Sequence, residues 1–528
     1  MYMEAASGKL THRTFSTMIL QGLRGSKLNY AIAIAGAMSW ILQGYDQAVM
    51  NELLNLDTFD NQFPALNVNL PGKNTIHASL IEGTTVAIYE AGCAIGSLSC
   101  YFVGDILGRK KLIVLLSYIV LIGVIIQATS FQLIQIIIGR VVTGFGVGGL
   151  TATIPMWISE CCSPESRGRL VLLSGFLAIA GVCLATWIGF AFYFVNGSSV
   201  NWRFPIALQT VFAIISITMM MVLPESPRWL IKRRRLEEAT EVLSRLEDAT
   251  VDSDRVQNEI AIIEQSLMED LEAEKSSPFS LTKNKHLRRT LMAICLNVGS
   301  QMTGINIVTF YSESIFQQQL GYSDITARIF SGSLQIWQTI AAFISIFLID
   351  RFGRRKLMIH CAALMAIAQF VLGGLSSNLA NPANGKAMIA FYFLALYAYP
   401  VGLFLVPFMY SAEIAPLEVR SRITALSSCG NWLFNFVVAE ASPTAFRVIG
   451  YRYYFIYGSI SIVLCISVWL MYPETKGRSL EEIDDIFVQS KGPFDTPRIA
   501  KQFAGLSDAL NRTKDDWNGK AEIEHVEQ

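Results

Sequence analysis

"GDILGRKK" (104–111) returns later in the chain as "IDRFGRRK" (349–356), and this repeat decides how the sequence is organised. The two copies lie 245 residues apart, counted from Asp105 to Asp350. Two further motifs recur in the same order, with offsets of 253 and 249 residues: "SECCSPESRGR" (159–169) with "AEIAPLEVRSR" (412–422), and "LPESPRWL" (223–230) with "YPETKGRSL" (472–480). Three motifs at nearly one offset predict two homologous halves.

Long apolar runs fill both halves. The chain has 528 residues, 52% of them hydrophobic, and its mean hydropathy is +0.41. Runs of about 20 apolar residues are long enough to cross a bilayer. We count twelve, at 30–51, 82–103, 111–129, 131–155, 170–195, 204–223, 290–318, 325–349, 357–377, 387–411, 423–446 and 452–472. The sequence therefore predicts an all-α membrane protein with twelve transmembrane helices in two pseudo-symmetric six-helix bundles.

The same pattern divides the chain into five parts. We expect an N-terminal segment (1–29), a first bundle (30–223), a loop with short helices (224–289), a second bundle (290–472) and a tail (473–528). In the loop, "RLEEATEVLSRL" (235–246) has a helical apolar face, as does "SLEEIDDIFVQS" (479–490) in the tail. We expect both to pack against neighbouring loops; binding to the membrane surface is the alternative.

Lysine and arginine gather in the loops on one side of the predicted bundles. This asymmetry places the repeated motifs, both termini and the 224–289 loop in the cytoplasm. Loop 52–81 is then external, and Asn196 in "NGSS" is an accessible acceptor for N-glycosylation. Acidic and basic residues balance at 42 each, so no overall charge favours nucleic acid.

Enzyme and metal chemistry find no support in the sequence. The nine cysteines are scattered without CxxC spacing, and the five histidines are isolated. No nucleophile–base pair or phosphate-binding loop occurs at motif spacing, so we expect no metal, no cofactor and no enzymatic activity. The glycines of 144–149 follow no strand; they allow close packing of helices instead.

Several motifs together resemble the sugar porter family of the major facilitator superfamily, over about 30–490. They are "GRVVTGFGVGG" (139–149), "PESPRWL" (224–230), "QMTGINIVTFY" (301–311), "DRFGRR" (350–355) and "PETKGRSLEE" (473–482). "WRFPIALQ" (202–209) and "NWLFNF" (431–436) resemble a fungal branch of hexose, polyol and glycerol carriers. The resemblance implies a monomeric, plasma-membrane carrier of a small polyhydroxylated solute that works by alternating access, either coupled to protons or facilitative.

Asp46 interrupts the first apolar run, in "WILQGYDQAVMNELL" (40–54). A carboxylate there costs several kcal/mol unless it has a partner or a function. Arg140, in "IQIIIGRVVTG" (134–144), interrupts the fourth run. The resemblance implies that Asp46 and Arg140 form the pair that couples transport to protons. The alternative is a permanent ion pair that only fixes packing.

The repeated motifs also supply charged residues that the resemblance assigns to two cytoplasmic networks, one in each half. In the first half they are Asp105, Arg109, Glu160, Arg167 and Glu225, and in the second Asp350, Arg354, Glu413, Arg420 and Glu474. In the family such networks hold the cytoplasmic side closed while the carrier faces outward. The alternative is that the basic residues only orient the helices in the bilayer.

Amide side chains in the second half are candidates for binding solute hydroxyls. They are Gln301, Asn306, Gln338, Asn431 and Asn435, with Tyr311 at the outer gate and Phe408 after a proline. Three positions depart from the family pattern: Gly175 and Ser300 stand where glutamine is common, and Phe408 where tryptophan is common. We therefore expect a pocket less polar than that of a typical hexose carrier.

Other functions stay open. A proton-coupled exporter of a less polar secondary metabolite is one, although "LLSGFLAIAGVCLATW" (172–187) lacks the Gly-Pro motif usual in drug antiporters. A transporter-like sensor is another, although such sensors generally have a longer tail. The sequence leaves the solute and the direction of flux unspecified.

Overall fold

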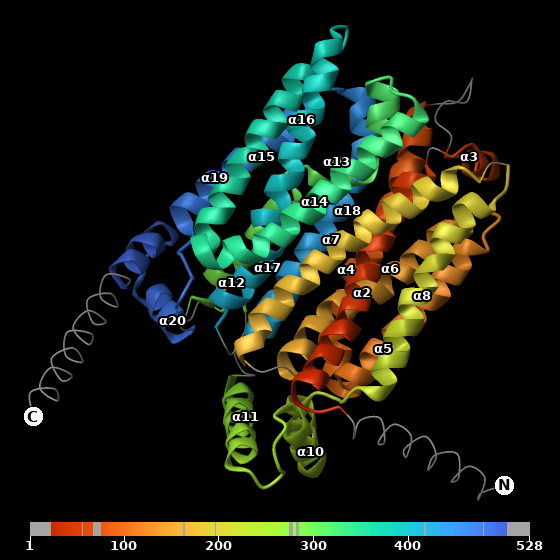
Figure 1. Cartoon of the computed structure of the whole chain (residues 1–528). Coiled ribbons are helices and arrows are strands. Elements are labelled where there is room, and N and C mark those ends of the chain that lie inside the picture. The colour runs from red at the N-terminus through yellow and green to blue at the C-terminus, as the bar shows by residue number, and fades with distance from the viewer. Residues whose placement is uncertain are drawn as a thin grey trace, which may run out of the picture.

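The computed structural model describes residues 23–54, 56–66, 75–161, 164–195, 197–273, 278–280, 285–416, 419–478 and 480–503. Within these ranges the chain is helical and contains no strand. The long helices run side by side as an elongated bundle (Figure 1). This is the all-α architecture that the apolar runs predict.

Each of the first six apolar runs forms one long helix. The helices are α2 (Gly25–Leu53), α4 (Thr75–Leu107), α5 (Arg109–Ala128), α6 (Leu133–Cys161), α7 (Pro164–Tyr193) and α8 (Val200–Val222), with a short α3 (Asp57–Gln62) after α2. The close packing expected of the glycines is confirmed between α4 and α6. A Cβ atom on Gly144 would lie 2.2 Å from Tyr89 O, and one on Gly148 would lie 2.1 Å from Cys93 O.

The second six runs also form six crossings, but two of them are broken. The crossings are α12 (His286–Gln301) with α13 (Ile305–Ser314) and the π-helix η1 (Ile315–Gln319), α14 (Asp324–Phe352), α15 (Arg354–Ser376), α16 (Pro382–Ala398) with the π-helix η2 (Tyr399–Leu403) and α17 (Leu405–Ile414), α18 (Arg420–Val448) and α19 (Arg452–Met471). Gly304, at φ +84°, ends the break between α12 and α13. Pro400 lies in η2, where the wider turn accommodates a residue without an N–H group.

Nine helical segments in the described ranges are long and apolar enough to cross a membrane by length and composition. Helices α2, α4 and α18 are not among them, although they have 29, 33 and 29 residues. Helix α2 buries Gln43, Asp46, Asn51 and Glu52. Its low hydropathy therefore reflects polar side chains that face the protein interior.

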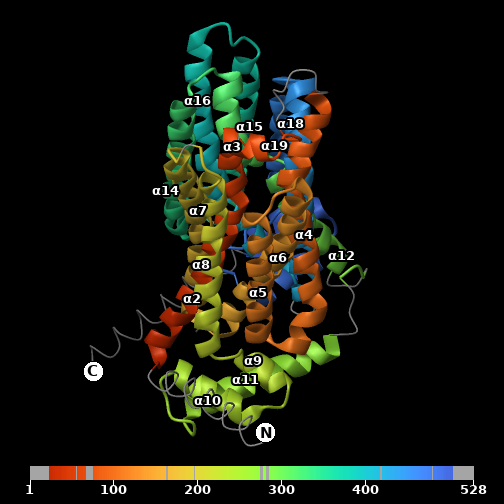
Figure 2. The ribbon, with the colours of Figure 1, turned by 90° about the vertical axis from the view of Figure 1, so that its right-hand side faces the viewer.

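The two halves meet along three main helix pairs: α4 with α18, α7 with α14, and α2 with α13. The pairing is close, because a Cβ atom on Gly83 of α4 would lie 2.5 Å from Glu440 O of α18. We call the end of the bundle that carries the repeated motifs the motif end, and the opposite end the α3 end. Helices α9 (Pro227–Lys232), α10 (Leu236–Leu246) and α11 (Asp254–Ala273) lie across the motif end (Figure 2).

Both predicted amphipathic segments are helical and packed against the protein. In α10, Ala239 and Leu243 are buried, whereas Leu236 is 44% exposed. In α20 (Leu480–Gln489), Ile483 and Phe487 are buried. Arg289, the fourth residue of α12, forms an ion pair with Asp484 of α20. That ion pair holds α20 against the second half.

Candidate functional site

A cluster of amides lies where α12 breaks. Gln301 is the last residue of α12, and its Nε2 donates to Asn431 Oδ1 of α18 (3.0 Å) and to Tyr399 OH of η2 (3.1 Å). Asn306 of α13 donates from Nδ2 to Gln301 Oε1 (3.0 Å). All four side chains are at most 5% exposed. The break therefore brings Gln301 and Asn306 together, although they do not share one continuous helix.

Further buried amides lie on α14 and α18. Gln338 and Gln335 stand about one turn apart on α14, and Asn435 is one turn from Asn431 on α18. The side-chain oxygens of Gln338, Gln335 and Asn435 accept no hydrogen bond from the described part of the chain. Each keeps an unused acceptor for a hydroxyl or for water. Tyr399 and Gln335 were missed in the sequence, since neither lies in a recognised motif.

The aromatic candidates occupy different surroundings. Tyr311 OH donates to Ala439 O of α18 (2.9 Å), and the side chain is 4% exposed. Phe408 is half-buried on α17, and Trp432, between the two asparagines of α18, is 7% exposed. Tyr311 therefore links α13 to α18, beside the contact of α18 with the first half.

Gly175 of α7 lies against Leu405 of α17. A Cβ atom on Gly175 would lie 2.0 Å from Leu405 Cδ1, 2.4 Å from Cγ and 2.5 Å from Cδ2. Ser300, the other position where glutamine is common, donates to its own helix at Asn297 O (2.7 Å). Leucine thus fills the space next to position 175. Position 175 therefore lacks the polar side chain common in the family, and Leu405 also fills the space that such a side chain would need.

Asp46 and Arg140 are both fully buried and lie close enough to interact electrostatically. They do not form the predicted direct ion pair in this structure. Arg140 Nη2 donates to Val86 O (2.9 Å), and the guanidinium lies 5.1 Å from the centre of the Tyr89 ring. The Gln209 side chain of α8 lies beside the Asp46 carboxylate, but within the described ranges neither carboxylate oxygen receives a hydrogen bond of good geometry.

A second carboxylate shares this environment. Glu90 of α4 is 1% exposed and lies within electrostatic reach of both Asp46 and Arg140. Glu90 was missed in the sequence. Its position inside the second apolar run was the available signal, by the same reasoning that identified Asp46.

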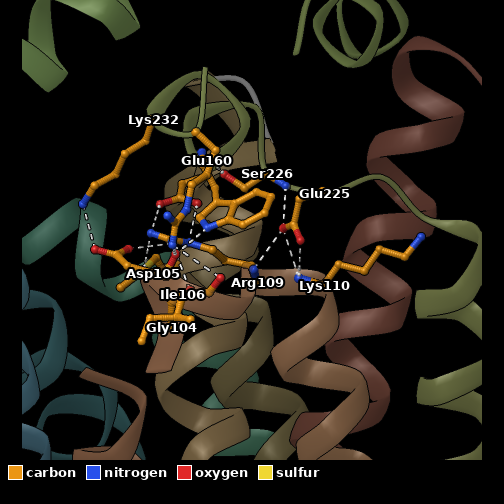
Figure 3. Close-up of polar contacts among 12 residues, drawn as sticks. Gly104, Asp105, Ile106, Arg109, Lys110, Glu160, Glu225, Ser226 and Lys232 are labelled. Carbon is orange, nitrogen blue, oxygen red and sulfur yellow. Dashed lines mark hydrogen bonds and ion pairs between the residues drawn. The ribbon is translucent and has the colours of Figure 1, made fainter. Parts of the chain in front are cut away.

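Three residues of the first expected charge network contact one another at the motif end (Figure 3). Arg109 is the first residue of α5, and its guanidinium contacts Asp105 Oδ1 (2.9 Å) and both oxygens of Glu160 (3.0 and 3.1 Å). Lys232 of α9 contacts the other oxygen of Asp105 (2.7 Å). The network therefore joins α4, α5 and α6 and ties the short helix α9 to them.

Glu225, the fourth described member of the expected network, bonds to backbone groups at the start of α5. Its Oε1 accepts from the backbone N–H groups of Arg109 (3.0 Å) and Lys110 (3.1 Å), so it caps the N-terminus of α5. Burial raises the pKa of the Glu225 carboxyl, and the N–H groups of Ser226, Lys110 and Arg109 act in the opposite direction. Gly108, at φ +85°, makes room: a Cβ atom there would lie 2.6 Å from Glu225 Oε2.

The second half builds the same junction. Glu474 accepts from the backbone N–H groups of Arg354 (2.9 Å) and Arg355 (3.2 Å), and Arg354 Nε contacts Glu413 Oε1 (3.1 Å). Gly353 has φ +87°, and a Cβ atom there would lie 2.7 Å from Glu474 Oε2. The repeat seen in the sequence is therefore a repeat of one three-dimensional junction.

Arg420 is the remaining predicted member whose side chain lies within the described residues. Arg420 donates to Ala415 O (3.3 Å), which is at the end of α17. The side chains of Arg167 and Asp350 lie outside the described residues, as does Asn196.

A third charged cluster, unforeseen from the sequence, joins the halves near the α3 end. Arg328 of α14 contacts Glu52 of α2 (3.1 Å) and Glu313 of α13 (2.7 Å). All three side chains are at most 1% exposed.

Among the described residues, no group of histidine, cysteine or acidic side chains could hold a metal ion.

Comparisons with known proteins agree with this architecture. The family model described as "Sugar (and other) transporter" matches residues 31–487. The chain is 37% identical over 493 residues to the sugar transporter STL1 of Saccharomyces cerevisiae, covering 92% of this chain and 86% of that protein. It is 34% identical over 501 residues to the major facilitator superfamily transporter mfsA of Aspergillus fumigatus, covering 92% and 91%.

Among solved structures, the proton:xylose symporter XylE of E. coli, bound to 6-bromo-6-deoxy-D-glucose, resembles this chain with a TM-score of 0.73. The match covers 88% of this chain and 100% of that one at 24% identity. At that identity the likeness establishes the fold.

Proposed function

The chain belongs to the sugar porter family of the major facilitator superfamily, and from this premise we propose that it takes up a sugar or polyol together with protons by alternating access. It is a multi-pass membrane transporter and not an enzyme. The names of two similar proteins, a sugar transporter and a proton:xylose symporter, support the solute class and the coupling.

The observation that carries the solute class is the amide cluster at the break of α12. Sugars and polyols present hydroxyl groups that both donate and accept, and carboxamides do the same. Gln301 and Asn306 are bonded to each other, while Gln338 and Asn435 keep unused acceptors on the same half, within the described part of the chain. A solute hydroxyl that inserts here can exchange with the bond between Gln301 and Asn306 and can also donate to the unused acceptors of Gln338 and Asn435.

Proton coupling rests on two buried carboxylates and one guanidinium. Arginine stays charged, so Arg140 can balance only one of Asp46 and Glu90. A second negative charge in this buried place is costly, and binding one proton removes it. We infer that a proton alternates with solute loading at Asp46, with Glu90 and Arg140 fixing the local charge.

The charge networks act as braces inside each half. Arg109 with Glu160, and Arg354 with Glu413, join helices of the same half at the motif end. Each half can therefore move as one body during alternation. We place the motif end and both termini in the cytoplasm, the protein as a monomer in the lipid bilayer of the plasma membrane, and Asn196 outside as a glycosylation acceptor.

A second candidate is favoured by the contact of Leu405 with Gly175. That leucine puts apolar atoms beside position 175, where glutamine is common in the family, which suits a less polar metabolite; a proton-coupled exporter would use the same carboxylates. Facilitative sugar transport is the further alternative, in which Asp46 has only a packing role.

The test is uptake of labelled hexoses, pentoses and polyols in transporter-deficient cells, with and without a protonophore. We expect accumulation against a gradient, abolished by the protonophore and by Asp46→Asn, with downhill exchange partly retained in the variant. Asp57→Asn is the matched control, since Asp57 is exposed on α3. Unchanged accumulation by Asp46→Asn would refute the coupling role, and uptake of none of the solutes would favour the exporter.

A further inference from the structure

The cluster of Glu52, Glu313 and Arg328 crosses from one half to the other. Glu52 belongs to α2 in the first half, whereas Glu313 and Arg328 belong to α13 and α14 in the second. Arg328 Nη1 contacts Glu52 Oε2 (3.1 Å) and also donates to Glu52 O (3.3 Å), and its Nη2 contacts Glu313 Oε1 (2.7 Å). One guanidinium therefore holds a carboxylate from each half.

The cluster is distinct from the coupling site. Glu52 lies six residues beyond Asp46 on α2, which is about 9 Å along the helix axis toward the α3 end. Tyr193 of α7 covers the cluster, with its ring centre 4.5 Å from the Arg328 guanidinium carbon. Four helices, two from each half, thus enclose it.

The charges do not balance. Two ionised carboxylates and one guanidinium leave a net charge of −1 inside a site closed to water, where an unbalanced charge is costly. Glu52 and Glu313 are also close enough for their carboxyl groups to share a hydrogen bond, which requires a proton on one of them. Glu313 Oε2 receives no hydrogen bond within the described ranges, so it has room for that proton.

We propose that Glu52, Glu313 and Arg328 form a proton-binding site between the halves, and that the bound proton keeps the α3 end closed. With the proton, the cluster is neutral and each carboxyl group is bonded. Without it, the extra negative charge favours separation of α2 from α13 and α14, which lets water reach the carboxylates. The role in transport rests on the proposed function, whereas proton-dependent closure does not.

Other polar groups surround the cluster. Asn51 donates to Glu52 Oε1 (3.1 Å), and Gln317 donates to Glu313 Oε1 (3.1 Å). Near the cluster, two more carboxylates face Tyr193. Asp324, at the start of α14, accepts from Tyr193 OH (3.4 Å) and lies within electrostatic reach of Glu313, and Asp57 of α3 lies within reach of Tyr193. Asp324 and Asp57 are exposed, so water screens them.

The consequence for a carrier whose α3 end faces outside is a second point of control by external protons. Protons would favour closure after the solute has entered, and their loss would favour reopening. The cluster controls opening of the α3 end, whereas Asp46 controls coupling of solute transport to protons. We therefore expect opening and coupling to depend on pH separately.

The experiment measures the opening directly. Spin labels at Asn61 on α3 and Asn381 before α16 report the distance between the halves, since both side chains are exposed near the α3 end. The full chain, with its native cysteines replaced, is studied in lipid nanodiscs between pH 5 and 8 without solute. We expect the ratio of open to closed molecules to rise with pH, by up to about tenfold per unit for one linked proton.

Variants separate this site from other titrating groups. Glu313→Gln and Glu52→Gln each keep the hydrogen bond but remove one titratable charge, so the closed form should persist at pH 8. Glu440→Gln is the matched control, since Glu440 also lies between the halves, where it accepts a hydrogen bond from Thr84 (2.7 Å) of α4. It lies outside the cluster, so this variant should titrate as the wild type does. Arg328→Gln removes the group that joins the two carboxylates, so it should raise the open fraction above that of the wild type.

Two results would overturn the proposal: no pH response in the wild type, or the same response in Glu313→Gln and Glu52→Gln as in the wild type. If Arg328→Gln does not fold, the two glutamate variants still decide the matter. Because the measurement needs no solute, absence of sugar transport would leave this result unaffected. Conversely, proton-coupled uptake with no pH-dependent opening would retain the transport function and remove this site from it.

Discussion

The contact between Gly175 and Leu405 predicts that a glutamine at position 175 blocks the carrier unless the leucine is trimmed. The three atoms nearest a Cβ on Gly175 are Leu405 Cδ1, Cγ and Cδ2, at 2.0, 2.4 and 2.5 Å. Because these separations are far below van der Waals contact, Gly175→Gln must displace Leu405 or part α7 from α17. Overpacking of this kind costs about 1–3 kcal/mol.

Leu405→Ala removes those same three atoms, so the two changes should compensate. We expect a coupling energy of about 1–3 kcal/mol between them, which is roughly fivefold to 150-fold in transport efficiency. In the double variant the new carboxamide can also bond a solute hydroxyl. That bond contributes about 1 kcal/mol, so hexoses should gain several-fold over small polyols.

The assay is concentration-dependent uptake of a labelled hexose and a labelled small polyol by the wild type, both single variants and the double variant, normalised to surface protein. Gly374→Gln is the control, since a Cβ there meets no atom within 4 Å. If Gly175→Gln alone transports as well as the wild type, or if Leu405→Ala fails to rescue it, then the leucine does not occupy the site as argued.

Three more predictions concern other parts of the molecule. Gly108→Ala should lower the unfolding temperature of the purified protein, because a residue with a Cβ at φ +85° is strained by about 1–3 kcal/mol. Gly104→Ala is the control: its Cβ would lie 3.8 Å from the nearest atom, so the unfolding temperature should stay unchanged. Gln301→Ala should weaken competition by every transported solute about tenfold or more, and unchanged affinity would contradict the amide site. Arg109→Ala removes the brace that joins α4, α5 and α6, so it should increase thiol labelling of cysteines introduced between these helices at the motif end; equal labelling would favour the orientation-only role.

The sequence predicts the helices well because apolar runs and repeated motifs are local signals. The breaks are less visible. Gly304 and Pro400 both lie inside runs that are apolar enough on average to count as one span, so the pattern predicts one helix from each run. Hydropathy responds to composition over a whole span, whereas a break depends on one backbone angle or one missing donor.

Single site residues can be predicted from the sequence when the residue type alone suggests the function. Gln301 and Asn431 are candidates because of their amides, and the structure brings them together. Glu52 and Arg328 escape notice in the sequence because their partnership spans 276 residues and two halves. Asp46 alone suggests a single partner, since nothing in one sequence says that α4 brings Glu90 to the same place.

The twin junctions at Gly108 and Gly353 have a consequence for protein engineering. Each is closed by residues of its own half, and the two copies are alike. A half could therefore be exchanged for the corresponding half of a relative with its braces intact. Chimeras cut between α11 and α12 should depend on the fit along α2, α4 and α7, and solute preference should follow the donor of the second half.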